Sequence, residues 1–383
     1  MDVRVYKTID ERRKALEANL RISLPHIGKN DLGPRAETHN CENMIGVAKI
    51  PLGIAGPLKI ESDKFNGSFF IPLATTEGAL VASINRGCKA ITLSGGAITA
   101  SCKVGATRGP VFYTGNIRNE QRLFGWVKKN EDKIKKTAER TSKHLKYKKL
   151  IFRGLADYAF IHFAFDTQDA MGMNMATIAT EKIVELVEKE TGIQCISLAG
   201  NFDSDKKPSW ISFIEGRGHK VWAEATIRKS IAKAILKTTS QKIYDVWLSK
   251  NMIGSAMSGS LGFNAHFANI VSAVFIATGQ DPAHVTDASM GLTTARVTRN
   301  GDLYFSIYIP ALMVGTVGGG TNLETQKEAL SIMGIVGGND GKNSQKLAEI
   351  IGGGVLAGEL SLLASLAEGT LASSHKKLAR GGK

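Results

Sequence analysis

Several features that would assign a protein class directly are scarce in this chain. Its four cysteines, Cys41, Cys88, Cys102 and Cys195, are scattered and lack the paired spacing of a metal site or a disulfide framework. No apolar run approaches the roughly 18 residues that a membrane span needs, and Met1 to Arg13 is too polar for a secretory signal. These absences predict a soluble protein of the reducing cytoplasm without a membrane partner.

The composition is otherwise that of a globular protein with an excess of basic residues. The 383 residues are 43% hydrophobic and 22% charged, enough for two or three domains with their own cores. The net charge of +14 suggests either a nucleic acid or a polyanionic small molecule such as a dinucleotide or coenzyme A. Residues 128–153 offer chiefly Tyr147 and Phe152 for base stacking, so a nucleic acid is not expected.

One charged loop near the middle of the chain admits two interpretations. Residues 199–208 follow a strand expected over 193–198 and contain Asp205, Lys206 and Lys207 in succession. Because charge runs usually lie on solvated faces, a surface turn is one interpretation. The other is a loop that delivers one lysine into a pocket, with its charge held by neighbouring aspartates. The loop alone does not decide between them.

Other polar residues stand at the ends of expected elements. Thr75 or Thr76 is expected to cap a helix and to place Glu77 in its first turn. A tight turn over residues 105–110 presents Arg108, a residue type suited to binding a carboxylate.

An apolar helix is expected through residues 264–277, with His266 and Asn269 on one face. Asp281 follows the C-terminal end of this helix, where the helix dipole disfavours a carboxylate. We therefore expect either a raised pKa or a cationic partner for Asp281. Farther along, residues 344–371 are expected to form a helix that Gly352–Gly354 interrupt.

A basic segment between residues 110 and 197 has the pattern of an inserted α+β module. In it, an expected strand over 158–165 is followed by a glycine-containing loop over 169–175 and a helix, which together offer backbone N–H groups to a phosphate. A second glycine-rich loop, 315–322, lacks the GxGxxG spacing, so no Rossmann domain is expected. After the module, residues 210–214 are expected to form a strand.

Six motifs, taken in their order along the chain, resemble those of 3-hydroxy-3-methylglutaryl-CoA (HMG-CoA) reductase. They are Glu42-Asn43-Met44-Ile45-Gly46, Ala74-Thr75-Thr76-Glu77-Gly78, Asp169-Ala170-Met171-Gly172-Met173-Asn174-Met175, Asp205-Lys206-Lys207-Pro208, Gly279-Gln280-Asp281 and Gly315-Thr316-Val317-Gly318-Gly319-Gly320-Thr321. The resemblance extends from about residue 42 to Arg380 and is to the class I form, reduced to a soluble catalytic portion.

The resemblance implies reductive deacylation of HMG-CoA to mevalonate and CoA with two NADPH. It implies that Lys206 stabilises the oxyanion, that His375 protonates the CoA thiolate and that Glu77 is the acid for mevaldehyde reduction. Asp281 would tune the pKa values of Glu77 and Lys206 through charge proximity. An oxidoreductase acting on another acyl-CoA, or running oxidatively with NADH, is the alternative.

The resemblance also implies two groups of binding residues. The substrate group is Arg108, Asp205, Lys207, Lys250, His266, Asn269, Ser83, Asn85 and Arg86. The cofactor group is Ser142, Lys143, Asp169, Met171, Gly172, Met173, Asn174, Gly318, Gly319 and Arg380. The chain departs from the family pattern at Ala199, where a serine is expected, and at Lys143-His144, which replaces an Arg-aromatic pair.

The fold implied by the resemblance is of the α+β or α/β class. A large α/β domain, residues 46–108 and 209–383, surrounds a long central helix and binds HMG and CoA. A ferredoxin-like NADP-binding domain, residues 109–197, is inserted in it and joined through the catalytic loop 198–208. Residues 1–45 form a small helical N-terminal region. A homodimer with shared active sites, possibly a tetramer, is also implied.

Overall fold

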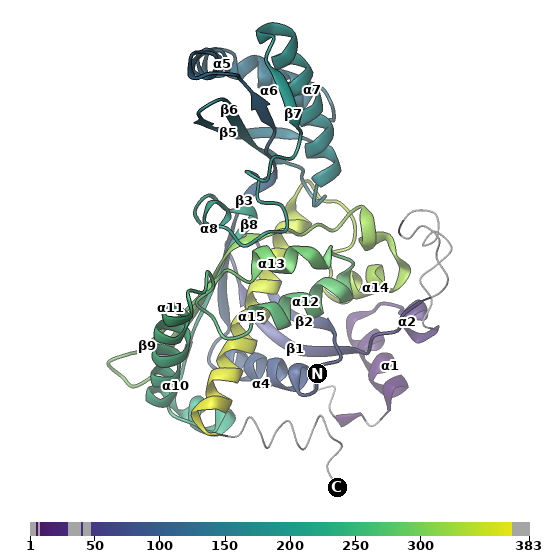
Figure 1. Ribbon diagram of the computed structural model, residues 1–383. Helices are drawn as coiled ribbons and strands as arrows, with labels where there is room; N and C mark the ends of the chain where they lie inside the picture. Colours follow the sequence, from purple (N-terminus) through teal and green to yellow (C-terminus); the bar gives the residue numbers. More distant parts are fainter. Residues whose placement is uncertain (1–4, 7, 30–39, 41–46, 370–383) are drawn as a thin grey trace.

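The computed structural model describes residues 5, 6, 8–29, 40 and 47–369. Figure 1 shows a large lower region and a smaller upper region, the latter built from the chain between β4 (Val111–Tyr113) and β7 (Gln194–Ser197). The Glu42–Gly46 motif, His375 and Arg380 lie outside the described residues.

The described residues form ten strands and a larger number of helices. The strands are β1 (Leu52–Glu61), β2 (Asn66–Ala74), β3 (Ala97–Arg108), β4 (Val111–Tyr113), β5 (Lys146–Leu155), β6 (Tyr158–Asp166), β7 (Gln194–Ser197), β8 (Arg217–Ile227), β9 (Leu292–Val297) and β10 (Leu303–Leu312). The helices before β8 are α1 (Ile9–Leu20), α2 (Pro25–Lys29), α4 (Leu80–Leu93), α5 (Ile117–Lys129), α6 (Glu131–Glu139), α7 (Met173–Thr191) and α8 (Trp210–Glu215). Those after β8 are α9 (Lys229–Ile231), η2 (Ala232–Leu236), α10 (Ser240–Val246), η3 (Trp247–Gly254), α11 (Ser255–Ser258), α12 (Phe267–Thr278), η4 (Pro282–His284), α13 (Val285–Ala288), η5 (Gly319–Asn322), α14 (Glu324–Ile332) and α15 (Lys342–Ala367).

One largely antiparallel sheet runs through both regions, in the order β7-β4-β6-β3-β8-β10-β9. β5 pairs with β6, while β1 pairs with β2 and, in parallel, with β3. β3 joins the two regions, because its residues Ile98–Gly105 pair with β8 and Ala106–Arg108 pair with β6. Arg108 is therefore the last residue of a strand at the junction and does not lie in the tight turn that the glycines suggested.

The core of the large region is organised around α15, which packs on α4, on α12 and across β8, β3 and β10 (Figure 1). Contrary to expectation, Gly352–Gly354 do not interrupt this helix. They are packing positions, because a Cβ at Gly352 would lie 2.6 Å from Val221 and one at Gly353 would lie 2.9 Å from Leu58. The same need for close approach appears on α4, where a Cβ at Gly87 would lie 1.9 Å from the Ala357 carbonyl oxygen.

α15 is also the one described helix that is long and apolar enough to cross a membrane, although no such run was expected from the sequence. Its most apolar window is 83% buried inside the protein. A core helix of a globular protein satisfies the same length and composition criteria, so this finding is explained by packing.

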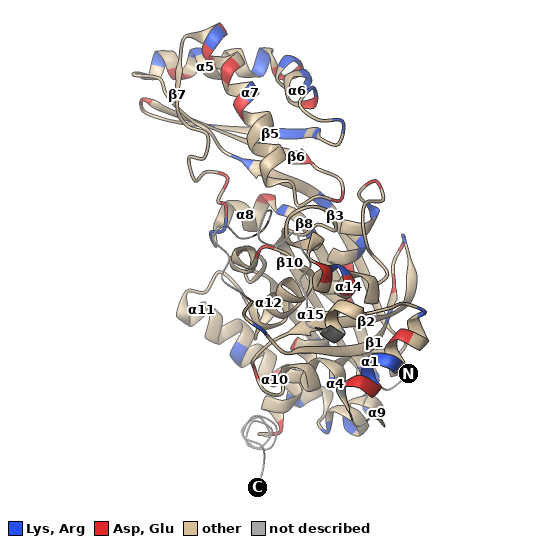
Figure 2. Cartoon of the chain, turned by 90° about the vertical axis from the view of Figure 1, so that its right-hand side faces the viewer, with Lys and Arg blue, Asp and Glu red and all other residues tan. Residues whose placement is uncertain are grey.

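The upper region has a separate hydrophobic core, in which Leu123, Phe163 and Ile183 are fully buried. Its four strands follow the order β7-β4-β6-β5, and every adjacent pair is antiparallel. Helices α5, α6 and α7 cover one face, and Figure 2 shows Lys and Arg residues along α5, α6 and β5.

Two local expectations were wrong because side-chain caps decided the structure. Residues 210–214 form helix α8 and not a strand, since Ser209 caps it by accepting a hydrogen bond from the Ser212 backbone N–H at 3.2 Å. Glu77 lies before α4 and not in its first turn. The Thr75 hydroxyl accepts from the Glu77 backbone N–H, and the helix begins only at Leu80.

Candidate functional site

The charged loop at residues 199–208 is held in a defined, strained conformation. Asn201, Ser204 and Lys206 all have positive φ, at 61°, 52° and 56°. Such conformations are costly for residues other than glycine and persist where surrounding contacts enforce them. The Lys206 ammonium meets the Asp281 carboxylate at 2.7 Å. The loop therefore does not have interchangeable surface charges, but its lysine is held by the distant Asp281 and not by the neighbouring aspartates that the second interpretation expected.

Two arginines anchor the remaining carboxylates of this loop. Arg108 Nη1 lies 3.3 Å from Asp203 Oδ2 and 3.6 Å from Asp205 Oδ2. Arg217 Nη2 lies 2.7 Å from Asp205 Oδ1. Lys207 is exposed, and its ammonium lies 3.5 Å from the Asp205 carbonyl oxygen. The loop therefore points its acidic side chains inward.

Arg217, the first residue of β8, is fully buried. Besides Asp205, its guanidinium donates to Thr107 Oγ1 at 2.8 Å and to Asp287 Oδ2 at 2.9 Å. The His284 ring is 3.1 Å away. The spacing of Asp281, His284 and Asp287 at three-residue intervals was a signal available in the sequence, because it indicates one face of a helical segment.

These contacts determine the ionisation of the loop aspartates. Burial works against ionisation of Asp205, but the charge and hydrogen bond of Arg217, together with the other neighbouring cations, outweigh it and lower the pKa of Asp205. Burial also opposes ionisation of Asp281, yet the hydrogen bond from Lys206 helps to hold its pKa below the usual value. Of the two outcomes expected for Asp281, the cationic partner is confirmed and the raised pKa is wrong. Burial dominates at Asp203 and raises its pKa.

Asp281 borders a cavity of about 720 Å³ between the two glycine-containing loops. Met171, Gly172, Met173 and Asn174 line one side, at the N-terminus of α7, and Gly318 and Gly319 line another. Gly172 has a φ of 92°, and a Cβ there would lie 2.2 Å from Thr167 Oγ1. The structure thus brings Asp281 together with six predicted cofactor residues.

The other predicted cofactor residues lie elsewhere. Asp169 is buried, and its carboxylate accepts from the backbone N–H groups of Asn339, Gly341 and Ser344 at 2.5, 2.8 and 2.8 Å. It therefore caps the start of α15. Ser142 and Lys143 follow α6 at the surface of the upper region, where Ser142 Oγ accepts from the His144 backbone N–H.

Glu77 lies at the other end of α12 from Asp281. Its Oε2 accepts a 2.7 Å hydrogen bond from Asn269 Nδ2, in the first turn of the helix. From Asn269 to Thr278 the helix rises about 14 Å, and Asp281 lies beyond that end. Among the described residues, no hydrogen bond or ion pair joins Glu77 to Lys206 or Asp281. Within the part of the chain that the structure describes, Glu77 is therefore not paired with either of the other two predicted catalytic groups.

His266 precedes α12 at its N-cap position and not on a helix face with Asn269. Its Nδ1 is 3.0 Å from Oε1 of Glu359, a fully buried residue of α15. Glu359 also accepts from the Ala265 and His266 backbone N–H groups and from Thr293 Oγ1. Burial opposes ionisation of Glu359, but the His266 hydrogen bond helps to lower its pKa.

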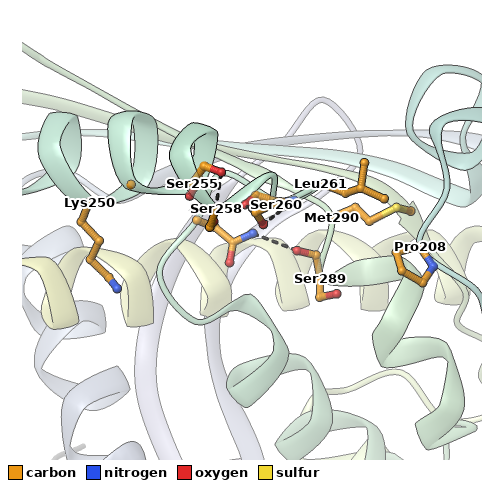
Figure 3. A pocket seen from close by; sticks show the side chains of 11 residues that line it. Pro208, Lys250, Ser255, Ser258, Ser260, Leu261, Ser289 and Met290 are labelled. Carbon is orange, nitrogen blue, oxygen red and sulfur yellow. Dashed lines mark hydrogen bonds between the residues drawn. The ribbon is translucent and has the colours of Figure 1, made fainter.

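Lys250 lies in the π-helix η3, a rare form that recurs at functional sites. It lines a pocket of about 650 Å³, and Figure 3 shows it at one end with Pro208, which ends the charged loop, at the other. Ser289 and Met290 lie between them on the wall that precedes β9.

Ser83, Asn85 and Arg86 on α4 use their polar atoms within the chain. Ser83 Oγ lies 2.9 Å from Ser361 Oγ, and Arg86 donates to the Ser361 carbonyl oxygen at 2.6 Å. Asn85 Oδ1 accepts from the Gly56 backbone N–H at 3.0 Å. Their contact with CoA stays a prediction.

Comparison with known proteins identifies the family. The family model described as hydroxymethylglutaryl-coenzyme A reductase matches residues 8–380. The chain is 50% identical over 374 residues to 3-hydroxy-3-methylglutaryl-coenzyme A reductase of Pyrococcus abyssi, covering 96% of this chain and 92% of that protein. It is 46% identical over 383 residues to the Methanothermobacter thermautotrophicus reductase, covering 99% and 95%.

The fold agrees with a solved structure. The class II 3-hydroxy-3-methylglutaryl-CoA reductase from Streptococcus pneumoniae, determined bound to NADPH, superposes with a TM-score of 0.76 at 18% identity, covering 94% of this chain and 97% of that one. At that identity the likeness concerns the fold alone. The family model and the archaeal relatives carry the assignment, and the chain belongs to the hydroxymethylglutaryl-coenzyme A reductase family.

Proposed function

We propose that this protein reduces HMG-CoA to mevalonate and CoA with NADPH, as a class I enzyme of the mevalonate pathway acting in the cytoplasm. The observation that carries the site assignment is the Lys206–Asp281 ion pair, whose carboxylate borders the cavity between the two glycine-containing loops. The class I assignment is supported by identities near 50% with archaeal reductases, against 18% with the class II enzyme.

The cavity fits a nicotinamide dinucleotide. The N-terminus of α7 has no side-chain cap, so its backbone N–H groups are available to a pyrophosphate. At Gly318 and Gly319 an added Cβ would meet no described atom within 4 Å, so this wall is open backbone. Ser142 and Lys143 would hold the 2′-phosphate, and Arg380 would add a further charge. The bound cofactor supplies hydride.

The residues of the chain supply binding and protons. Lys206, held by Asp281, stabilises the negative charge that develops on the thioester oxygen. His375 protonates the departing CoA thiolate, and Glu77 donates the proton to the mevaldehyde carbonyl. Arg108 holds Asp205 and Asp203 in place, so it acts on the substrate pocket through the loop.

We also propose that each active site is shared between two subunits of a homodimer. The support is the distance of about 14 Å along α12 that separates Asn269, the partner of Glu77, from the end of the helix that precedes Asp281. In a two-fold dimer, Glu77 of one chain can approach Lys206 of the other.

The domain limits proposed from the sequence are supported by the separate core of the upper region. Its strand order β7-β4-β6-β5, with the succession strand, helices, strand, strand, helix, strand, is that of a ferredoxin-like domain. Residues 109–197 then form the NADP-binding domain, 198–208 the catalytic loop, 46–108 and 209–383 the large domain, and 1–45 the N-terminal region.

Initial rates test the reaction. NADPH oxidation with HMG-CoA is expected to exceed NADH oxidation and to exceed cofactor reduction with mevalonate plus CoA. A preference for NADH in the oxidative direction would instead support the alternative reaction.

Subunit complementation tests the shared site. Lys206→Ala and Glu77→Gln chains carrying different tags are co-expressed, and the mixed dimers are isolated through both tags. With shared sites, one of the two sites carries both substitutions and the other carries neither, so about half of the wild-type rate per dimer is expected. Mixed dimers as inactive as each parent would show that the site lies within one chain.

A further inference from the structure

His284 is a buried residue that no part of the proposed mechanism uses. It ends the short helix η4, three residues after Asp281, and its side chain is fully buried. Asp281 caps the same helix by accepting from the Ala283 backbone N–H at 3.0 Å. The histidine ring is therefore fixed to the same turn as the carboxylate that holds Lys206.

One ring nitrogen of His284 is anchored and the other is not. Nδ1 lies 3.0 Å from Asp287 Oδ2 and 3.1 Å from Arg217 Nη1. Nε2 is buried without a hydrogen-bond partner in the described residues. It faces Asp205 Oδ1 at 3.9 Å and Asp281 Oδ2 at 4.0 Å. The ring thus stands between the anchoring pair and two carboxylates of the proposed site.

The contacts limit the protonation state of the ring. Arginine only donates, so Nδ1 faces Arg217 favourably as an acceptor, and the proton of the neutral ring is then on Nε2. If Nδ1 instead donates to Asp287, a neutral ring would direct the lone pair of Nε2 toward the carboxylates of Asp205 and Asp281. Only the doubly protonated ring avoids this repulsion. In both favourable states Nε2 carries a proton directed toward Asp205 and Asp281.

The charges around the ring agree with this state. Four carboxylates belong to the connected cluster: Asp203, Asp205, Asp281 and Asp287. Three basic side chains pair with them, namely Arg108, Arg217 and Lys206. A proton on His284 Nε2 supplies positive potential where the carboxylates outnumber the cations.

We propose that His284, anchored by Asp287 and Arg217, is a positioning residue that holds Asp205 and Asp281 and thereby fixes Lys206. This inference rests on the proposed role of Lys206. The loop needs such support, because Ser204 and Lys206 both have positive φ. His284 acts on substrate only through the two aspartates.

Steady-state kinetics test the proposal with two variants and a control. His284→Leu removes the donor, whereas His284→Gln keeps an N–H near the position of Nε2. His219→Leu is the matched control, since His219 is equally buried but belongs to neither the loop nor its anchors. The fold of each variant is compared by circular dichroism and thermal unfolding.

We expect His284→Leu to lower kcat about 10- to 100-fold, the loss that a misplacement of about 1 Å causes, with KM for NADPH nearly unchanged. His284→Gln is expected to recover most of that loss, and His219→Leu to match wild type at pH 7. A folded His284→Leu enzyme with wild-type kcat, or a Gln variant as impaired as the Leu variant, would overturn the proposal. If the wild-type enzyme itself does not reduce HMG-CoA, the proposed function fails instead.

A measurement independent of activity is the ring protonation. In protein labelled with ¹⁵N-histidine, the resonances that disappear in His284→Gln identify the ring of His284. Protonated Nε2 is expected across neutral pH. A neutral ring with its proton on Nδ1 would overturn the proposal even if the Leu variant fails to fold.

Discussion

The two ends of α12 carry two polar clusters of different construction. Beyond its C-terminal end, Lys206 and Asp281 rest on a buried network around Arg217, in which ion pairs lie at 2.7–2.9 Å. Near its N-terminal end, Glu77 is exposed, and its carboxylate accepts a hydrogen bond from Asn269. The first cluster is fixed by its own chain, whereas the second leaves Glu77 free to meet a further group. This difference is consistent with the proposal that the site is shared between two subunits.

The largest expected effect is that of Lys206→Ala. We expect kcat to fall about a thousandfold in both half-reactions, because the variant lacks the cation that stabilises each developing oxyanion. Thermal unfolding should change little, since the lysine is partly exposed. Rates with HMG-CoA and with mevaldehyde are measured separately. Full mevaldehyde reduction by this variant would contradict the role of Lys206.

The second largest effect is expected for Arg217→Met, which should lower the stability of the fold. It leaves Asp205 and Asp287 without their main cationic partner in a buried site, which typically costs about 3–5 kcal/mol. Urea unfolding measures the change. Arg296→Met is the matched control, because Arg296 is exposed on β9 and should alter stability by less than about 0.5 kcal/mol. Equal stability of the two variants would refute the structural importance of the network.

Mild acidification is expected to lower the stability of the protein through two buried histidines that lie outside the clusters. Burial lowers the pKa of His219 to about 3 and that of His162 to about 4. The unfolded chain therefore takes up these protons first, and stability falls as pH drops below about 6.5. At pH 5 we expect a loss of about 2 kcal/mol for each histidine.

The buried and half-buried carboxylates near the two ends of α12 behave differently. Asp205, Asp281 and Glu359 have lowered pKa values, so their contribution persists at pH 5 and is lost only at still lower pH. His219→Leu should flatten the decline in stability between pH 6.5 and 5, measured by urea unfolding. Asp281→Asn should leave the pH dependence of stability between pH 6.5 and 5 unchanged. A pH dependence altered by Asp281→Asn and not by His219→Leu would contradict this prediction.

The smallest effect is expected for Asn269→Ala. It removes the single hydrogen bond to Glu77, worth about 0.5–1.5 kcal/mol, so kcat/KM should fall about 2- to 10-fold with little change in stability. Asn264→Ala provides a contrast, because its amide bonds two backbone carbonyls and should affect mainly stability. A larger activity loss at Asn264 than at Asn269 would weaken the assignment of the exposed cluster.

The sequence by itself determined the family and most of the local structure. The order of six motifs pointed to the reductase family, and the local pattern located strand β6 and the helix α7 that follows it. Local patterns sufficed there because caps and alternation act within a few residues. The same reasoning failed at residues 210–214, where the Ser209 cap outweighed a strand-like run.

Only the tertiary structure decided which charges matter. The sequence did not single out Arg217, and Gly352–Gly354 were expected to interrupt a helix, because burial in β8 and packing of α15 depend on residues distant in sequence. The pairing of Lys206 with Asp281, 75 positions apart in the sequence, is likewise set by the folded chain. Electrostatic partners are chosen by proximity in space, and the separation of Glu77 from that pair is a property of the length of α12.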